Sequence, residues 1–279
     1  LALAVQASRP TTMVLVPDLL RGWVAGLKAG LVPRPQGLRF VAVGGAPVPA
    51  VVADQAWEFG IPVHEGYGLT ECCSVVAVNR PGERRAGTVG RALRGTEIGI
   101  EEGEIVVRSA SVMEGYLGQA PAGGLWRTGD LGSLDADGYL RVDGRLDNVI
   151  VLSNGRNVSP EWIETALTAD ARIGRAIVVG HGRPYPIAIV CPSLLGRGWF
   201  DRSAPASRNA LLADLCEALP AYARPRAMLM TDAEALVRDD LLTANQRPRR
   251  GRILAHFAAA LEELYAELEP AERTTNAIL

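Results

Sequence analysis

The spacing of apolar residues changes near residue 86, and this change constrains the fold more than any other feature of the sequence. Before it, helical patterns alternate with short apolar runs such as RFVAVG. After it, short β-rich runs are separated by glycine turns, with clear alternation over residues 104–108 and 139–142. Alternating helices and strands are typical of α/β layers around a buried parallel sheet, whereas short alternating runs are typical of antiparallel sheets. We therefore predict an α/β part over residues 1–85 and a small antiparallel, barrel-like part over residues 86–146.

Proline and glycine positions define the expected elements of these two parts. A helical pattern follows Pro17, and a second helix is expected over Pro49–Phe59 with its proline near the first turn. Ile61–Val63 is expected to be a short strand, and EGYGLTE, residues 65–71, a loop. Asp137-Gly138 is a typical hairpin turn. The later strands are expected in TVGRAL, EIGIEEGEIVVRS, GYLG and YLRVDGR.

A second domain is predicted over residues 147–279, about the size of an ordinary domain. NVIVLSNGRNV is expected to form strand, turn and strand, and Ser159 is a suitable N-cap for a helix that begins with Pro160. The remaining pattern predicts a compact α+β unit. Its expected elements are strands over Arg175–Gly180 and Pro186–Val190, a helix over Asn209–Leu219, and an amphipathic helix over Ile253–Leu268 with Ile253, Phe257, Leu261, Leu264 and Leu268 in one stripe.

Composition excludes several classes of function. The net charge is −2 and no basic block precedes residue 247, which argues against a nucleic-acid partner. No apolar run approaches the length of a membrane span. The four cysteines form no CxxC pair, so neither a zinc site nor a disulfide framework is expected and a reducing cytoplasm is the default location. The start, LALAVQASRP, is unlike a signal peptide and is typical of the interior of a longer chain.

Three polar segments carry candidate chemistry. In EGYGLTECC, Thr70 and Glu71 place a hydroxyl beside a carboxylate, a combination that suits a Mg²⁺-bound phosphate. In RTGD, Asp130 can accept both hydroxyls of a ribose. In GRLDNVI, Arg145 can reach a phosphate or a ribose as a fixed cation. Taken one at a time, the segments also fit an ordinary glycine turn, an Asx-turn and a surface ion pair.

The order of the segments is more informative than any one of them. YGLTE, RTGD, GRLDNVIV and SNGRNVSPEWIE follow one another through most of the chain, and this order resembles the adenylate-forming superfamily: acyl- and aryl-CoA synthetases, luciferases and the adenylation domains of peptide synthetases. GGAPVP resembles the adenine-side loop of that family, and GTVGRAL with GEIVVRSASVMEGYLG resembles the segment that leads into RTGD. LSNGRNVSPEWIE and the segment after LLTANQRPRR are most similar to long-chain-type acyl-CoA synthetases.

The resemblance implies a reaction and a site. Family members join a carboxylate to ATP as an acyl-adenylate with Mg²⁺, and then transfer the acyl group to the thiol of CoA or of a carrier-protein pantetheine. The implied catalytic residues are Thr70 at the α-phosphate, Glu71 at the metal and Arg247. The implied cofactor-binding residues are Gly45, Ala46, Pro47, Tyr67 and Gly68 near adenine, Asp130 and Arg145 at the ribose, Asp147 at the interdomain hinge, and Ser153 and Gly155 along the path of the thiol.

Two departures from the family pattern leave alternatives open. The Ser/Thr/Gly-rich phosphate loop that ends in a lysine does not precede YGLTE, and the C-terminal catalytic lysine is replaced by Arg247, with Arg249 and Arg250 as further candidates. Arginine keeps the charge but changes its geometry. The expected activity is an AMP-forming acid–thiol ligase acting on a hydrophobic carboxylic acid and CoA. The alternatives are a degenerate homologue that binds a nucleotide or acyl-adenylate without making it, and a module that loads a carrier protein. A carrier protein or the missing N-terminal half is a possible protein partner.

Overall fold

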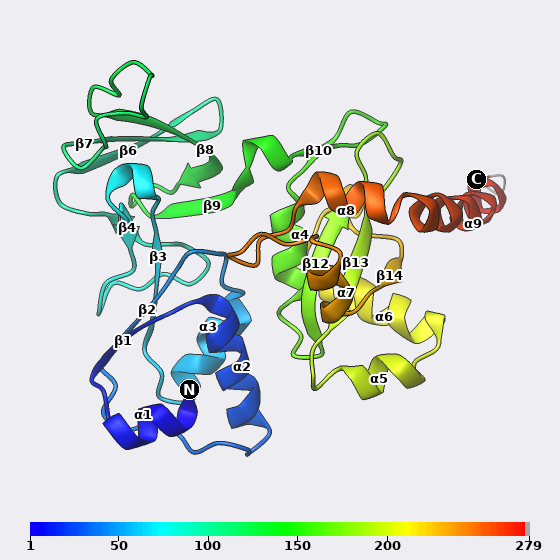
Figure 1. The fold of residues 1–279 in the computed structure, drawn as a ribbon, viewed down its shortest axis with the longest axis horizontal. Coiled ribbons are helices and arrows are strands. Elements are labelled where there is room, and N and C mark those ends of the chain that lie inside the picture. Colours follow the sequence, from blue (N-terminus) through cyan, green and yellow to red (C-terminus); the bar gives the residue numbers. More distant parts are fainter. Residues whose placement is uncertain (277–279) are drawn as a thin grey trace. The chain divides into compact units, whose positions relative to one another are not determined.

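A computed structural model describes residues 1–276 of the chain. The chain divides into two compact units, Leu1–Val149 and Ile150–Leu279, each with its own apolar core (Figure 1). Along the described residues, no helix combines the length and the apolar character that crossing a membrane requires.

The first unit begins with a parallel sheet covered by helices. Strands β1 (Thr12–Leu15), β2 (Phe40–Val43) and β3 (Val63–Tyr67) pair in parallel, and α1 (Ala2–Ser8), α2 (Pro17–Lys28) and α3 (Ala50–Glu58) precede or connect them (Figure 1). The α/β prediction is confirmed. The short strand predicted at Ile61–Val63 is wrong in its bounds, because β3 starts at Val63 and includes the first three of the seven residues of the predicted loop. Two short antiparallel strands, β4 (Ala77–Val78) and β5 (Arg91–Ala92), complete this sheet.

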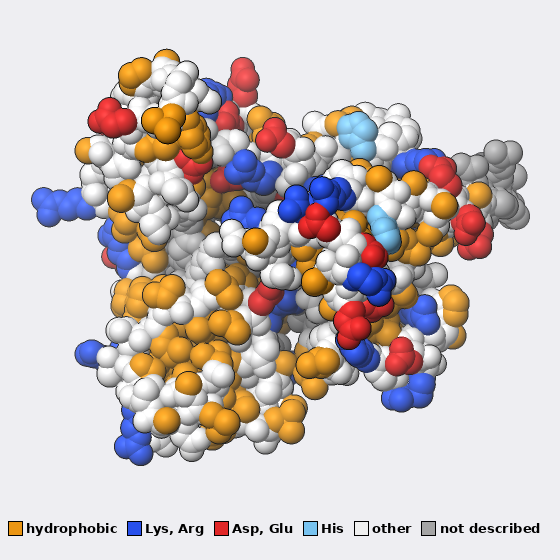
Figure 2. Space-filling model, in the orientation of Figure 1, with side chains coloured by type: hydrophobic (Ala, Val, Ile, Leu, Met, Phe, Trp, Pro, Cys, Tyr) orange, Lys and Arg blue, Asp and Glu red, His pale blue; other side chains and the backbone are white. Residues whose placement is uncertain are grey.

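Helix α2 shows why these elements form where they do. Pro17 occupies its first turn, where a missing N–H costs nothing, and Asp18 and Lys28 lie at the ends that favour their charges. Its apolar residues recur every three or four positions, so that Leu20, Trp23, Val24 and Leu27 are buried on one face. Apolar side chains also gather on the surface around α1, β1 and α2 (Figure 2), where Val14 is 84% exposed.

The second part of the first unit is an antiparallel sheet, as predicted, and it has four strands, one of which, over Leu125–Leu134, was not among the predicted strands. β6 (Thr96–Glu101), β7 (Glu104–Ser109), β8 (Leu125–Leu134) and β9 (Leu140–Arg145) pair in sequence order, and a bridge between Arg91 and Tyr139 joins this sheet to the first. The β8–β9 hairpin turns at Asp137-Gly138 as expected. GYLG does not form the predicted strand, because Gly115 and Gly118 have φ of +149° and +80°, conformations outside the strand region. The single-turn helices η1 (Thr70–Cys72) and η2 (Leu146–Asn148) belong to this unit.

The second unit is an α+β fold with its sheet between two apolar layers. β12 (Ile173–Val179) pairs antiparallel with β13 (Ile187–Pro192), which pairs parallel with β14 (Met228–Met230). Alternate residues point to opposite faces, so Ala176 and Val178 pack with α4 (Pro160–Leu167) and α6 (Pro205–Leu215), whereas Ile177 and Val179 pack with α8 (Arg250–His256) and α9 (Ala258–Asn276). The other elements are the hairpin strands β10 (Ile150–Val151) and β11 (Asn157–Val158), and α5 (Arg197–Arg202), η3 (Ala221–Ala223) and α7 (Ala233–Arg238).

Two helix predictions in this unit need correction. The helix predicted over Asn209–Leu219 is α6, which begins four residues earlier because Pro205 occupies its first turn, and which ends at Leu215 instead of Leu219. The single helix predicted over Ile253–Leu268 is two helices, since α8 ends at His256 and α9 begins at Ala258. The predicted apolar stripe nevertheless packs into one cluster across this break.

Candidate functional site

Asp130 is the centre of the polar cluster in the first unit. Its side chain is largely buried, with 9% of the residue exposed. Arg145 lies directly opposite on the neighbouring strand, and its Nη1 donates to Asp130 Oδ1 over 2.9 Å. The phenol of Tyr67, at the end of β3, donates to Asp130 Oδ2 over 2.5 Å. The structure therefore brings together three of the predicted nucleotide-binding residues, from β3, β8 and β9, in one hydrogen-bonded group.

The protonation state of Tyr67 favours this arrangement. Burial raises the pKa of the Tyr67 phenol well above its ordinary value, and the hydrogen bond to the Asp130 carboxylate raises this pKa further. The phenol is therefore a fixed hydrogen-bond donor at neutral pH. Because an ionised carboxylate offers about four lone-pair positions, Asp130 keeps acceptor capacity for a ligand after it has bound Tyr67 and Arg145.

RTGD lies inside β8 instead of at a turn before a strand. Thr128, which the sequence reasoning did not single out, donates its Oγ1 hydrogen to the Ile105 carbonyl over 2.7 Å and accepts the Asp130 N–H over 3.0 Å. Gly129 has φ of +70°, and a Cβ there would lie 3.4 Å from Arg145 Nη2. A glycine is therefore suited to this position both by its backbone conformation and by the close approach of the Arg145 guanidinium.

Glu71 lies in η1, shortly after Tyr67 in the chain. The Tyr116 hydroxyl donates to Glu71 Oε1 over 2.6 Å. That hydrogen bond is the main cause of the lowered pKa of the Glu71 carboxyl, and the positive charge of Arg145 lowers this pKa further. Thr70 is exposed beside it. The sequence did not point to Tyr116, although it lies in GEIVVRSASVMEGYLG, because nothing local shows that this loop reaches η1.

The residues predicted to contact adenine follow β2 and β3. Gly45, Ala46 and Pro47 are exposed just after the carboxyl end of β2. Tyr67 and Gly68 lie at the carboxyl end of β3, the adjacent parallel strand. Ligands of open parallel sheets characteristically bind beyond the carboxyl ends of the strands. The predicted adenine-side residues are therefore at the edge of the sheet where a ligand is expected.

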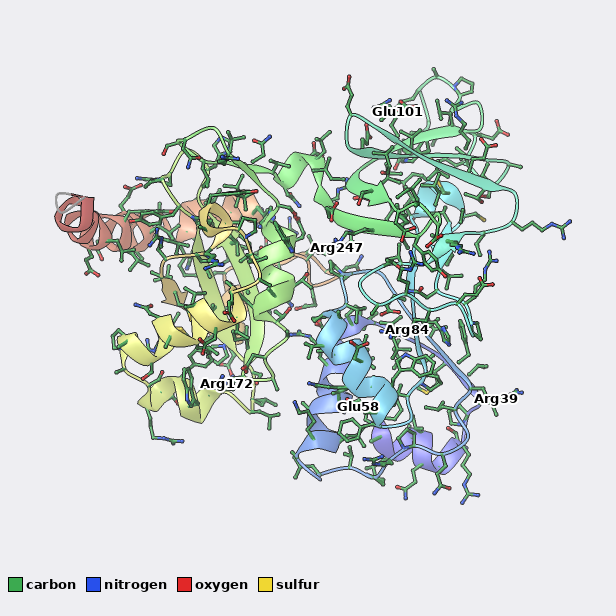
Figure 3. The ribbon with its side chains drawn as sticks, turned by 180° about the vertical axis from the view of Figure 1, so that it is seen from behind. Arg39, Glu58, Arg84, Glu101, Arg172 and Arg247 are labelled. Carbon is green, nitrogen blue, oxygen red and sulfur yellow. The ribbon has the colours of Figure 1, made fainter. Side chains whose placement is uncertain are left out.

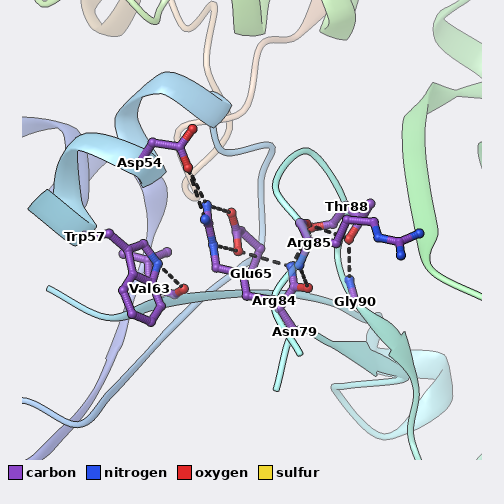
Figure 4. Close-up of polar contacts among 9 residues, drawn as sticks. All are labelled: Asp54, Trp57, Val63, Glu65, Asn79, Arg84, Arg85, Thr88 and Gly90. Carbon is purple, nitrogen blue, oxygen red and sulfur yellow. Dashed lines mark hydrogen bonds and ion pairs between the residues drawn. The ribbon is translucent and has the colours of Figure 1, made fainter. Parts of the chain in front are cut away.

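The turn after β3 depends on glycine. A Cβ added at Gly68 would lie 1.7 Å from the Ser74 carbonyl oxygen, a distance that no side chain tolerates. β3 itself is fixed by Glu65, whose buried carboxylate pairs with Arg84 at 3.0 Å and accepts from Asn79 at 3.1 Å (Figure 4). Arg84 also bonds Asp54 of α3 over 3.0 Å, so strand, helix and loop are joined behind the Tyr67 end of β3.

The donor set suits a nucleotide with a hard cation. Glu71 carries a carboxylate, and the hydrogen bond from Tyr116 lowers its pKa further below neutral pH. Among residues 1–276, no three His, Cys, Asp or Glu side chains gather into a group able to hold a metal. Mg²⁺ is commonly held by one or two carboxylates together with waters and phosphate oxygens. A single carboxylate at Glu71 fits such a nucleotide-bound ion.

The remaining predicted residues lie outside the Asp130 cluster. Asp147 is exposed in η2, near the end of the first unit. Ser153 and Gly155 are exposed in the turn between β10 and β11, where the Gly155 N–H donates to the Leu152 carbonyl over 2.9 Å.

Arg247 lies on a loop of the second unit, labelled in Figure 3. The Thr243 N–H donates to the Arg247 carbonyl over 2.8 Å, and the Arg247 N–H donates to Thr243 Oγ1 over 3.0 Å. The Arg247 side chain is exposed. Arg249 bonds the Leu242 carbonyl over 3.1 Å, and Arg250 bonds Glu164 over 3.0 Å. Arg249 and Arg250 are therefore poor replacements for the absent lysine, because internal partners already hold both guanidinium groups.

Comparison with known proteins identifies the family of the chain. The AMP-binding enzyme model matches residues 1–117, and the AMP-binding enzyme C-terminal domain model matches residues 147–269. The long-chain-fatty-acid–CoA ligase FadD15 of Mycobacterium bovis is 31% identical over 252 residues, which are 81% of this chain and 42% of that protein. The chain thus spans less than half the length of this relative.

Solved structures give the same result. The o-succinylbenzoate CoA synthetase (MenE) of Bacillus subtilis, in complex with the acyl-adenylate intermediate, is similar with a TM-score of 0.71 and 26% identity, over 90% of this chain and 52% of that chain. The same synthetase in complex with ATP and a magnesium ion gives a TM-score of 0.67 and 26% identity, over 82% of this chain and 49% of that chain. The two family models together cover most of the chain, which therefore belongs to the AMP-binding enzyme family of adenylate-forming proteins.

Proposed function

We propose that this chain carries the nucleotide site and the small C-terminal domain of an AMP-forming acid–thiol ligase of the acyl-CoA synthetase type. The observation that carries the proposal is the Tyr67–Asp130–Arg145 cluster, which lies in the same unit as the ionised Glu71. Support comes from the match to both AMP-binding enzyme models and from relatives named as CoA ligases.

Asp130 would bind the ribose of the nucleotide. Its carboxylate is oriented by the Tyr67 phenol on one oxygen and the Arg145 guanidinium on the other. These bonds hold the acceptor oxygens in one geometry before a ligand arrives, so little side-chain freedom is lost on binding. Gly45, Ala46 and Pro47, with Tyr67 and Gly68, would form the adenine side.

Glu71 would hold the cation that accompanies the phosphates, with Thr70 at the α-phosphate. When bound, Mg²⁺ supplies positive charge where negative charge develops on phosphate oxygens during adenylate formation. The Tyr116 hydrogen bond lowers the pKa of the Glu71 carboxyl and would orient it for this task. The complex of the Bacillus subtilis synthetase with ATP and magnesium supports ATP with Mg²⁺ as the ligands here.

The second unit would serve the transfer of the acyl group to a thiol. We assign Asp147 to the hinge, Ser153 and Gly155 to the path of the thiol, and Arg247 to the cation that replaces lysine. CoA is the proposed acceptor, with carrier-protein pantetheine as the alternative, in the cytoplasm. The proposed acid is hydrophobic, and a long-chain fatty acid is the first to test because of the relative FadD15.

AMP binding measured by calorimetry tests the nucleotide site directly. Asp130→Ala should weaken binding by about 1–3 kcal/mol, roughly 5- to 150-fold, because it removes the ribose acceptor. Glu97→Gln is the matched control, since Glu97 is an exposed carboxylate on β6 of the same sheet. Equal affinity of Asp130→Ala and the wild type would refute the ribose assignment.

Pyrophosphate exchange with ATP and a panel of acids tests the activity itself. Exchange that depends on a hydrophobic acid supports the ligase. AMP binding without exchange by any acid favours the second candidate, a homologue that binds the nucleotide without making the adenylate. Arg247 in the position of the family's lysine is the observation that favours this candidate.

A further inference from the structure

The strand that carries Asp130 is irregular where the site lies. In the β7–β8 ladder, Glu104 pairs with Leu131 and Val106 pairs with Arg127. The single residue Ile105 on β7 therefore faces three residues of β8, Thr128, Gly129 and Asp130. Bulges of this kind bend a strand and re-aim its side chains, and they recur beside active sites.

Two side chains replace the lost ladder hydrogen bonds across this bulge. The Thr128 hydroxyl bonds the Ile105 carbonyl, as described above. The Gly129 N–H donates to Glu104 Oε1 over 2.9 Å, and this carboxylate belongs to the first residue of β7. Glu104 therefore holds the Thr128–Gly129 peptide, and Thr128 Oγ1 accepts from the N–H of the next peptide, that of Asp130.

Glu104 is an unusual group to find in this role. The residue is only 8% exposed, and burying an ionised carboxylate is costly unless it is paired. Arg127 on β8 supplies the pairing, with its Nε 2.9 Å and its Nη2 2.7 Å from Glu104 Oε2. One carboxylate oxygen thus binds the cation, and the other is reserved for the Gly129 amide.

We propose that Glu104 is a positioning residue for the nucleotide site: its carboxylate fixes the Gly129 peptide, and so aims the Asp130 side chain at Tyr67 and Arg145. This inference rests on the proposed nucleotide-binding function. The physical reason is that glycine has more conformational freedom than any other residue type and Gly129 has φ of +70°. The bond from Glu104 restrains the N–H side of Gly129, which the bond between Thr128 Oγ1 and the Asp130 N–H does not reach. Glu104 would therefore act through Gly129, and not by contact with the nucleotide.

The decisive experiment compares two variants of similar volume. Glu104→Gln keeps an oxygen able to accept the Gly129 N–H, whereas Glu104→Met removes the acceptor. In folded protein, AMP affinity measured by calorimetry should fall at least tenfold in Glu104→Met and stay within about threefold of wild type in Glu104→Gln. A merely structural role would lower the melting temperature of both variants without separating their affinities.

Glu101→Gln is the matched control. Glu101, labelled in Figure 3, bonds the same Arg127 from the exposed end of β6, whereas the Gly129 N–H donates to Glu104. Its AMP affinity should equal that of wild type. A tenfold loss in Glu101→Gln, or equal losses in the Gln and Met variants of Glu104, would overturn the inference in favour of a charge effect. If Glu104→Met does not fold, a tenfold loss in folded Glu104→Gln overturns it, and retained affinity supports it.

The outcome also separates this inference from the function on which it rests. A wild-type chain that binds neither AMP nor an acyl-adenylate analogue would refute both. Weakened AMP binding in Asp130→Ala with wild-type affinity in Glu104→Met would leave the proposed function standing and refute only the role of Glu104.

Discussion

Two arginine–carboxylate pairs of nearly the same length serve different ends in the two units. Arg145 meets Asp130 at 2.9 Å and Arg250 meets Glu164 at 3.0 Å, and both carboxylates are largely buried. The Arg145 side chain is 48% exposed, whereas that of Arg250 is 22% exposed. Arg250 also bonds Glu161 and the Val178 carbonyl, so it ties α4, β12 and α8 together. The ion pair alone therefore does not distinguish a binding site from a structural link. The exposure of the arginine and the number of its other protein partners do.

The carboxyl groups show the same contrast. Burial raises the pKa of Glu164 even though Arg250 opposes this effect. In the first unit, the hydrogen bond from Tyr116 lowers the pKa of Glu71, which is less deeply buried. Desolvation therefore dominates in the structural pair, and directed hydrogen bonding dominates at the candidate site.

Removing the structural arginine should give the largest effect. Arg250→Ala removes the cation that pairs with the buried Glu164, and should lower the free energy of unfolding by about 2–3 kcal/mol, slightly less than for fully buried pairs. Urea unfolding followed by tryptophan fluorescence measures this change. Arg247→Ala, on the exposed loop, should stay within about 0.5 kcal/mol of wild type. Equal unfolding free energies for the two variants would break the comparison.

Removing the site arginine should act on binding more than on stability. Arg145→Ala should weaken AMP binding by about 1–2 kcal/mol, because Asp130 loses the group that orients one oxygen. Calorimetry measures this, with Arg249→Ala as the control in the second unit. If Arg249→Ala weakened AMP binding as much, the distinction drawn between the two clusters would be wrong.

Tyr67→Phe should remove about 1 kcal/mol of stability at neutral pH through the lost hydrogen bond to Asp130. The pKa of this phenol is raised in the folded chain, so its contribution is complete below the unfolded value near 10 and is lost as the pH rises through the folded value. The difference in unfolding free energy between wild type and Tyr67→Phe should therefore shrink above about pH 10. A difference that stays constant from neutral to strongly alkaline pH would contradict the raised pKa.

The smallest expected effect concerns Glu71. Tyr116→Phe should raise the pKa of the Glu71 carboxyl, because the hydrogen bond that favours its ionised form is lost. Carbon-13 NMR of the carboxyl group during an acid titration measures the shift. Tyr139→Phe is the control, since that hydroxyl bonds the Glu83 carbonyl instead. An unchanged Glu71 titration in Tyr116→Phe would show that the Tyr116 hydrogen bond is not what lowers this pKa.

Much of the fold could be predicted because its signals are local. Pro17 with the spacing of Leu20, Trp23, Val24 and Leu27 predicts α2, and Asp137-Gly138 predicts the hairpin between β8 and β9. The bounds of the helices and strands were harder to predict. β3 extends to Tyr67 because Gly66 and Tyr67 pair with Val78 and Ala77, which a local pattern does not reveal. The break between α8 and α9 at Phe257 likewise interrupts a stripe that remains periodic.

For the candidate site, too, some features follow from the sequence and others only from the tertiary structure. By itself, the sequence determined the identity and order of Tyr67, Glu71, Asp130 and Arg145, since short motifs preserve chemical groups at fixed separations. Only the tertiary structure decided that Asp130 accepts from Tyr67 63 residues away, that Glu104 holds the Gly129 amide, and that Arg250 is structural. Strand register, burial and the number of partners set these roles, and all three arise from segments distant in sequence that meet only in the folded chain.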